Sequence, residues 1–253
     1  MLTAKHQKKY IRKLEREAID QLKAIAHSTD EESIHRFRIA IKKMKALQSL
    51  LKDFKKKNFI RPVKKAFKAT GGVRDIGNAN AIELDHFKLS TRTSQKRKSE
   101  FEAEYRKLAR HILEYKPCFA KTKKKFTRQI GGVHMKMLKN HFGKELAKIP
   151  RLIVRNDIEA IHESRKKLKN LFYLHNMLPE PLQRKLNIRI KYIDDLQDKI
   201  GKWHDLVQAE PMLKKRIGEK QLIVIRSEKQ SFLDEIRNMT SGFRSKSVQY
   251  AEQ

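Results

Sequence analysis

The sequence is poor in the residues that interrupt helices or cross-link chains. It contains 9 glycines, 6 prolines and one cysteine in 253 residues. A single thiol, Cys118, can neither form an intramolecular disulfide nor build a zinc site by itself, which indicates a reducing compartment. No apolar run approaches the roughly 18 to 20 residues that span a bilayer, and the N-terminal segment lacks an apolar core of signal-peptide length. We therefore expect a cytoplasmic protein that does not insert into a membrane.

Acidic residues are scarce beside basic ones. The chain has 60 lysines and arginines against 29 aspartates and glutamates, a formal net charge of +31 and a pI near 10.2. Hydrophobic residues nevertheless make up 39% of the chain, too many for a disordered tail. A folded protein with this much charge repels itself, and a polyanionic partner would relieve the repulsion. A nucleic acid, an anionic membrane or a phosphate polymer would each serve.

Strand-like alternation is also absent from the sequence. Between the few glycines and prolines, apolar residues recur at spacings of three and four, which predicts an all-α protein. Asp30 or Ser28 can cap the helix that comes after them, and Asp157 or Asn156 can cap the helix that begins IEAIHESRKK. We expect a helix to end or begin at Pro150.

Two stretches of the sequence occur twice. IHRFRIAIKKMKALQSLL at 34–51 aligns without gaps with IHESRKKLKNLFYLHNML at 161–178. Downstream of each lies a second matching pair, GGVRDIGNA at 71–79 and GKWHDLVQA at 201–209. Because order and spacing are both preserved, the pattern favours an internal duplication over chance. The predicted halves of this single domain are residues 1–118 and 119–253.

Basic side chains lie along one side of each repeated helix. At 100° per residue, four side chains of the first copy share a narrow stripe beside the apolar sector: His35, Arg38, Lys42 and Lys45. The second copy repeats the stripe with His162, Arg165, Lys169 and Phe172, flanked by Lys166 and Tyr173. A cationic row beside buried surface predicts a groove, and an ordinary solvated face is the alternative in so basic a chain.

The two glycine-containing segments allow two interpretations. Glycine could break the helix, with Asp75 or Asp205 capping the next helix. The break could also bring Arg74 and His204 to the same groove, where the aspartates anchor neighbouring basic side chains by charge-assisted hydrogen bonds. Both interpretations can hold together, and both predict a helix break at the glycines.

Motifs for catalysis are missing. The sequence has no phosphate-binding loop of the type G-x-x-x-x-G-K-[ST], no H-E-x-x-H and no C-x-x-C. No nucleophile with an adjacent base can be identified either. We therefore expect a binding protein that is not an enzyme, with no cofactor and no metal site.

The repeated segments together resemble the CHAD family, the conserved histidine α-helical domain, over nearly the whole chain. The resemblance implies two similar helical bundles around a basic central channel, and a protein that binds inorganic polyphosphate and associates with polyphosphate granules. The residues that it places in the channel are His35, Arg38, Lys42, Lys45, His162, Arg165, Lys166 and Lys169. Further candidates are Arg61, Lys65 and Lys68 on the helix leading into GGVRD, and Tyr173, which matches an aromatic common in the family.

The chain departs from the family pattern in its second half. Phe172 replaces a frequent arginine, and Trp203 and His204 precede the second aspartate where another pair is common. The second wall of the predicted channel should therefore be less cationic than the first.

Three functions are compatible with a basic groove. Polyphosphate has no bases, so its recognition needs point charges and guanidinium groups instead of stacking platforms. Aromatic residues are sparse in the basic rows, which favours polyphosphate over the alternative of non-specific nucleic-acid binding. A polyphosphate-processing enzyme is a further alternative. In the empty groove, neighbouring cations should disfavour the imidazolium form of His35 and His162, and bound phosphates should favour it.

Overall fold

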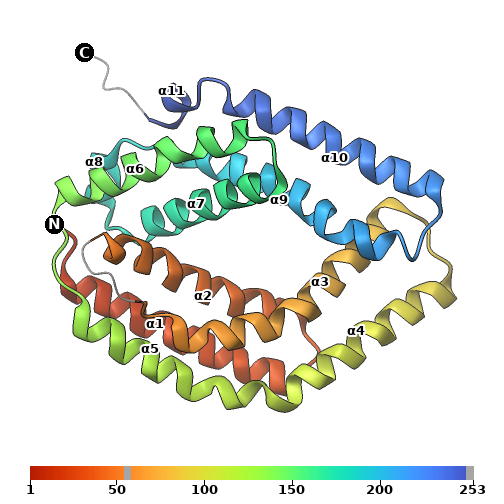
Figure 1. Ribbon diagram of the computed structural model, residues 1–253. Coiled ribbons are helices and arrows are strands. Elements are labelled where there is room, and N and C mark those ends of the chain that lie inside the picture. Colours follow the sequence, from red (N-terminus) through yellow and green to blue (C-terminus); the bar gives the residue numbers. More distant parts are fainter. Residues whose placement is uncertain (54–57, 249–253) are drawn as a thin grey trace.

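The computed structural model describes residues 1–53 and 58–248, which form an all-α fold (Figure 1). Within these ranges two isolated backbone bridges, Leu2 with Val133 and Ile188 with Val248, do not extend into strands. The predicted fold class is confirmed in this respect. Among the described helices, none is long and apolar enough to cross a membrane.

Helices and 3-10 turns alternate with short connections along the chain. In chain order they are α1 (Ala4–His27), α2 (Glu31–Lys52), η1 (Arg61–Val63), α3 (Lys64–His86), α4 (Thr91–His111), η2 (Ile112–Tyr115), α5 (Lys116–Gln129), α6 (Met135–Val154), α7 (Ile158–Met177), α8 (Glu180–Leu186), α9 (Ile190–Leu213), α10 (Glu219–Thr240) and α11 (Phe243–Ser247).

The helices are arranged in two layers (Figure 1). In the N-terminal layer α1 packs on α2 and α5, and α3 packs on α2 and α4. In the C-terminal layer α7 packs on α6 and α9, and α9 packs on α10. The layers meet where α2 contacts α7 and α3 contacts α9. The predicted boundary at 118/119 falls within α5, whose packing on α1 places it with the N-terminal layer.

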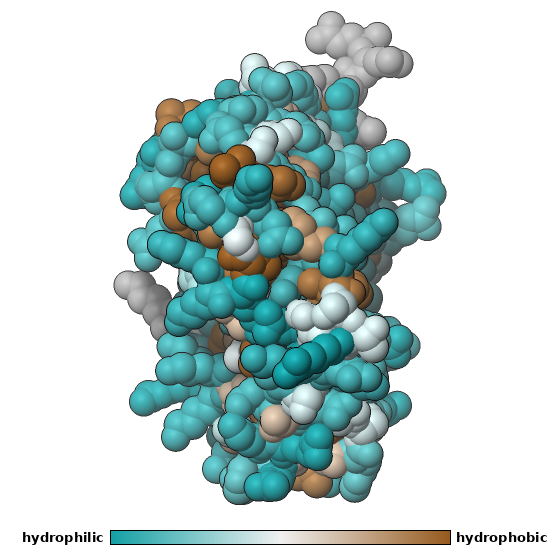
Figure 2. Space-filling view, turned by 90° about the vertical axis from the view of Figure 1, so that its right-hand side faces the viewer, coloured by the Kyte–Doolittle hydropathy of each residue, from teal (hydrophilic) through white to brown (hydrophobic). Residues whose placement is uncertain are grey.

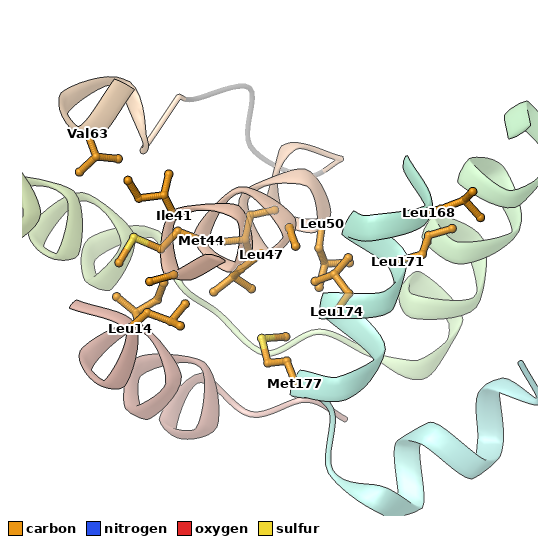
Figure 3. Packing of buried hydrophobic residues seen from close by; sticks show 14 of the residues in the cluster. Leu14, Ile41, Met44, Leu47, Leu50, Val63, Leu168, Leu171, Leu174 and Met177 are labelled. Atoms are coloured by element: carbon orange, nitrogen blue, oxygen red, sulfur yellow. The ribbon is translucent and has the colours of Figure 1, made fainter. Parts of the chain in front are cut away.

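Apolar contacts hold α2 and α7 together near their C-terminal ends. Figure 3 shows Leu50 of α2 beside Leu174 of α7, with Leu47 and Met177 close by, and all four are buried. Complete burial of such side chains stabilises the fold by roughly 1.5 to 3 kcal/mol each. Because this contact involves only the C-terminal ends, the N-terminal and middle turns of α2 and α7 line the space between the layers.

Aspartate caps begin both of these helices. The Asp30 carboxylate accepts hydrogen bonds from the backbone N–H groups of Glu32 and Ser33 at 3.0 and 3.1 Å. Asp157 accepts one from the N–H of Ala160 at 2.7 Å. Of the alternatives considered in the sequence, the aspartate is the cap in each case, because its carboxylate satisfies N–H groups that have no partner within the helix.

The expected helix breaks at the glycines are wrong. α3 runs without interruption through Gly71, and α9 runs through Gly201, so Asp75 and Asp205 lie inside helices and cap neither. In the C-terminal layer a break does occur before α9, at Asn187, which ends α8 in the left-handed conformation with φ 53°. Gly201 instead permits the close approach of Arg165 from the neighbouring helix α7.

Pro150 does not end a helix either. It lies inside α6, which continues to Val154. Ile149 and Ile153 on the same helix are both buried against the core. The free energy gained by packing this apolar face therefore exceeds the cost of the backbone hydrogen bond that is lost at proline.

The surface is mostly polar on the side shown in Figure 2, where hydrophobic residues are scattered between hydrophilic ones. The exposed large hydrophobic residues among those described include Leu84, Val154 and Ile223. Since these three lie on α3, α6 and α10, they come from different helices. The charged surface and the space between the layers are therefore the features that could bind a partner.

Candidate functional site

A cleft of about 440 Å³ lies between the two layers. We call it the central cleft, and α2, α3, α7 and α9 all contribute to it. Its lining residues are Glu31, Glu32, Ile34, His35, Arg38, Lys42, Arg74, Asn78, Arg165, Lys169 and Asp205. Six of the residues predicted from the sequence are therefore brought together here: His35, Arg38, Lys42, Arg74, Arg165 and Lys169.

Arg38 is held in the wall of the cleft by α3. Its side chain is only 8% exposed, and its Nη1 donates hydrogen bonds to the carbonyl of Phe67 at 2.7 Å and to Oγ1 of Thr70 at 3.1 Å. The guanidinium carbon lies 4.0 Å from the centre of the Phe67 ring. Burial lowers the pKa of Arg38 to about 10, so the group remains charged at neutral pH. These contacts fix a cation at the edge of the cleft.

Lysines at the cleft are crowded by other cations. Burial, and then the proximity of Lys169 and Arg74, lowers the pKa of Lys42 to about 6. Burial and Arg165 lower the pKa of Lys169 to about 8. Lys45 lies outside the lining, with its Nζ 3.8 Å from the Phe67 ring, and burial lowers its pKa to about 8. The empty cleft therefore disfavours positive charge on these amines.

Besides Arg38, which bonds to a carbonyl and a hydroxyl, three cations of the lining lack an acidic partner. Among the described residues, no carboxylate lies within the 4.0 Å of an ion pair from Lys42, Arg165 or Lys169. Arg165 also has a buried Nε with no hydrogen-bond partner. Burial lowers the pKa of Arg165 as well. Unpaired, partly buried cations destabilise an empty protein, and they are the property of the central cleft that most requires a functional explanation.

Arg74 is the exception, because it has acidic neighbours. Its Nη2 lies 3.1 Å from Oδ1 of Asp205, which also accepts a hydrogen bond from Nδ2 of Asn78 at 3.4 Å. Its Nη1 lies 3.6 Å from Oδ1 of Asp75. The predicted anchoring of a basic side chain by Asp205 is confirmed, and the contact joins α3 to α9 across the layers.

The predicted histidines occupy two different environments. His35 lines the cleft and is exposed, whereas the His162 and His204 rings stack with centroids 4.1 Å apart at 22°. Burial lowers the pKa of His204 to about 3, so its ring is neutral at physiological pH. Burial is the main reason for the lowered pKa of His35 and of His162, and neighbouring cations contribute less than burial does. The predicted direction is thus correct, although cations were expected to be its cause.

The remaining predicted residues lie outside the cleft lining. Lys166 is exposed and ion-paired with Glu163. Tyr173 is half-buried, with its ring 5.9 Å from that of Phe172, and burial raises its pKa. Three candidates on η1 and α3 are exposed and do not contribute to the lining: Arg61, Lys65 and Lys68.

Several lining residues were missed by the sequence reasoning. Glu31, Glu32 and Asn78 line the cleft, and Phe67 supports Arg38 and Lys45 from behind. Phe67 lies four residues before Gly71 and Asn78 four residues after Arg74, which places them on one face of an unbroken helix. A prediction of α3 as one continuous helix would therefore have placed Phe67 and Asn78 at the cleft.

Within the described ranges, no group of three or more histidine, cysteine, aspartate or glutamate side chains could hold a metal ion. The central cleft instead combines arginine and lysine side chains, which repel metal cations and attract anions. Its chemistry is therefore that of an anion-binding site.

Glycine provides room for an arginine at corresponding places of the two layers. A Cβ at Gly201 would lie 2.9 Å from Nη2 of Arg165, and a Cβ at Gly71 would lie 3.8 Å from Nη1 of Arg38. Both glycines thus lie opposite an arginine, but the approach is tight only at Gly201, since a Cβ at Gly71 would be in ordinary van der Waals contact. The duplication itself remains a prediction.

Substitution of Gly201 by alanine tests this close approach. A Cβ at Gly72 would meet nothing within 4 Å, so Gly72→Ala is the control. In the control, alanine should raise the free energy of unfolding by about 0.5 to 1 kcal/mol through its helix propensity. We expect Gly201→Ala to gain less stability than the control, because the guanidinium of Arg165 must move. Thermal unfolding measures both variants, and equal stabilisation of the two would contradict the proposed role of Gly201.

Comparison with known proteins identifies the fold. A search of curated protein sequences gives no significant match. The structure is similar to the crystal structure of the CHAD domain from the plant Ricinus communis, with a TM-score of 0.74 and 13% sequence identity over 95% of this chain and 92% of that one. The family model described as CHAD domain matches residues 9–214. Because this match covers most of the sequence, the chain belongs to the CHAD family.

Proposed function

We propose that the protein binds inorganic polyphosphate in the central cleft, without catalysing its conversion. The unpaired cations Lys42, Arg165 and Lys169 carry this proposal. They lie together although burial and mutual repulsion disfavour the charge on each, and a bound anion would offset this penalty. Phosphate oxygens would supply the missing counter-charges and accept charge-assisted hydrogen bonds from all three groups.

The arrangement of the arginines supports a phosphate chain as the ligand. Arg38 and Arg165 belong to different layers, and both contribute to the same lining. Guanidinium groups match phosphate oxygens with paired donors, and the lysines add point charges between them. A flexible chain of phosphates can follow this lining and contact both walls at once.

Features that would favour other functions are weak at this site. Phe67 is covered by Arg38 and Lys45, so its ring does not offer a free platform for stacking a nucleic-acid base. The lining contains no serine, threonine, tyrosine or cysteine that could act as a nucleophile. We therefore propose binding in preference to nucleic-acid recognition or phosphoryl transfer. We further propose a cytoplasmic location at polyphosphate granules, where this ligand is concentrated.

A competition experiment tests the proposed function. The protein is bound to labelled long-chain polyphosphate at about 0.15 M salt, near the physiological value. Unlabelled polyphosphate is then compared with single-stranded DNA and RNA of equal total charge. Polyphosphate should compete far better than either nucleic acid, and the affinity should fall steeply with salt because bound counterions are released. Equal competition by the three polymers would reject the proposal in favour of general polyanion binding.

Incubation of the protein with polyphosphate and a divalent cation tests the absence of catalysis. Chain length is followed by gel electrophoresis over several hours. We expect no shortening and no release of orthophosphate. Progressive shortening that depends on protein concentration would instead make the protein an enzyme.

A further inference from the structure

Within the described part of the chain, three carboxylates line the central cleft, and that of Asp205 is bonded to one of its arginines. Asp205 of α9 has a side chain that is 30% exposed and lines the cleft together with Arg74, Arg165 and Lys169. Its Oδ1 lies 3.1 Å from Nη2 of Arg74 and 3.4 Å from Nδ2 of Asn78. A carboxylate oxygen that accepts from a guanidinium and an amide occupies the kind of position that a phosphate oxygen would take.

Asp205 also acts on cations that it does not pair with. Its negative charge opposes the lowering of the pKa of both Arg165 and Lys169. Glu31 and Glu32 lie at the cleft too, but Glu32 pairs with Arg36 on the outside, and Glu31 lies against Gly77. Asp205 is therefore the carboxylate of the lining that is bonded to a cleft arginine.

We propose that Asp205 is an internal counter-anion that occupies a phosphate position in the empty cleft and makes binding selective for long chains. This inference rests on the proposed polyphosphate-binding function. Arg74 and Asn78, adjacent on one face of α3, would be the groups released to the ligand when Asp205 is displaced.

The selectivity arises from competition between tethered groups. The Asp205 carboxylate is attached to the protein, so its effective concentration at Arg74 is high, on the order of millimolar or more. A small phosphate must displace it unaided. When Arg38, Lys42 and Arg165 already hold a long chain, its next phosphate is also attached near Arg74. Its effective concentration there is then comparable to that of the Asp205 carboxylate.

Asp75 provides the matched control. It corresponds to Asp205 in the sequence repeat and approaches the same guanidinium, with its Oδ1 3.6 Å from Nη1 of Arg74. Its side chain is 47% exposed, and it does not line the cleft. Loss of the Asp75 charge should therefore leave Asp205 in place at Nη2 of Arg74 and change the affinities for short and long chains by the same factor.

The experiment compares tripolyphosphate with long-chain polyphosphate. Dissociation constants of both ligands are measured by titration calorimetry for wild type, Asp205→Asn, Asp205→Glu and Asp75→Asn. We expect Asp205→Asn to bind tripolyphosphate about tenfold more tightly, as loss of one nearby like charge allows, and long chains less than about threefold more tightly. Asp205→Glu should retain the wild-type preference for long chains, and Asp75→Asn should alter both affinities by the same small factor.

The outcomes separate the inference from the function on which it rests. If wild type fails to bind long chains, the proposed function is wrong. If wild type binds them, but Asp205→Asn weakens both ligands or strengthens both equally, Asp205 is not a selective competitor. A second readout is the NMR titration of the Lys169 amine, whose pKa should fall in Asp205→Asn because a neighbouring negative charge is lost. An unchanged Lys169 titration would also contradict the inference.

Discussion

Replacement of Lys42 and Lys169 together by methionine is expected to weaken polyphosphate binding by at least about 100-fold, while the ligand-free protein becomes more stable. A hydrogen bond to a charged group contributes about 1.5 to 3 kcal/mol, and loss of two such bonds gives an effect of this size. Methionine keeps an unbranched apolar stem of similar length in the same partly buried position.

The gain in stability is a consequence of the lowered pKa of the two amines. Lys42 changes from an ordinary pKa of 10.5 to about 6 on folding, and Lys169 from 10.5 to about 8. Between these values the unfolded chain binds protons that the folded chain does not, and this lowers the free energy of unfolding. At pH 8 the double variant should therefore gain roughly 1 to 3 kcal/mol, or several degrees in Tm.

Lys124 and Lys125 of α5 provide a control with the same loss of charge. Both are exposed and lie outside the lining of the central cleft. Lys124→Met/Lys125→Met should change affinity only a few-fold and should not raise Tm. Similar losses of affinity in the two double variants would show that net charge, not the central cleft, determines binding. A lower Tm in Lys42→Met/Lys169→Met would show that the lysines do not strain the empty protein.

Binding should weaken as pH rises, because phosphates must be bound by protonated lysines. In the empty cleft Lys42, with a pKa of about 6, is largely neutral at pH 8, whereas a bound phosphate raises this pKa. Formation of the complex then takes up a proton. If the pKa in the complex exceeds 8, linkage predicts an affinity about 50-fold lower at pH 8 than at pH 6. Lys169 and Lys45, with pKa values of about 8, extend the decline to higher pH.

Calorimetry at pH 8 in buffers of different ionisation enthalpy measures this proton uptake directly. Wild type should take up about one proton or more per cleft, since Lys42 alone changes from neutral to charged. Lys42→Met should take up fewer protons and show a flatter dependence on pH. Equal affinity at pH 6 and pH 8, with no buffer dependence, would contradict the assignment of Lys42 as a phosphate ligand.

The sequence was sufficient for the fold class but not for the helix ends near the centre. Apolar spacing correctly indicated helices, and aspartates in front of apolar periods correctly indicated caps at Asp30 and Asp157. Gly71 and Gly201 were taken as helix breakers because glycine weakens an isolated helix. In the structure both helices continue through their glycines, and at Gly201 a side chain would meet Arg165 of the neighbouring helix, a tertiary contact that is invisible in local propensity.

The sequence predicted where the basic rows on α2 and α7 lie, but it did not predict the features that depend on burial, and the role of these rows in binding stays a prediction. Helical spacing placed Arg38, Lys42 and Arg165 on facing surfaces, and the structure brings them to one cleft. The same spacing gave His35 and His162 equivalent places, but His35 lines the cleft whereas His162 stacks on the buried ring of His204. Exposure depends on how α7 packs on α9, and this information is not contained in either helix alone.

The structure of a complex with a short polyphosphate tests the central claim most directly. A crystal or NMR structure with a chain of about ten phosphates would locate the ligand relative to both layers, and charge-assisted contacts are recognised by distances of about 2.7 to 2.9 Å. We expect phosphate oxygens at this distance from Lys42, Arg165 and Lys169, with the chain passing between α2 and α7. A chain bound only to the exposed lysines of the outer helices, with the central cleft unchanged, would contradict the account.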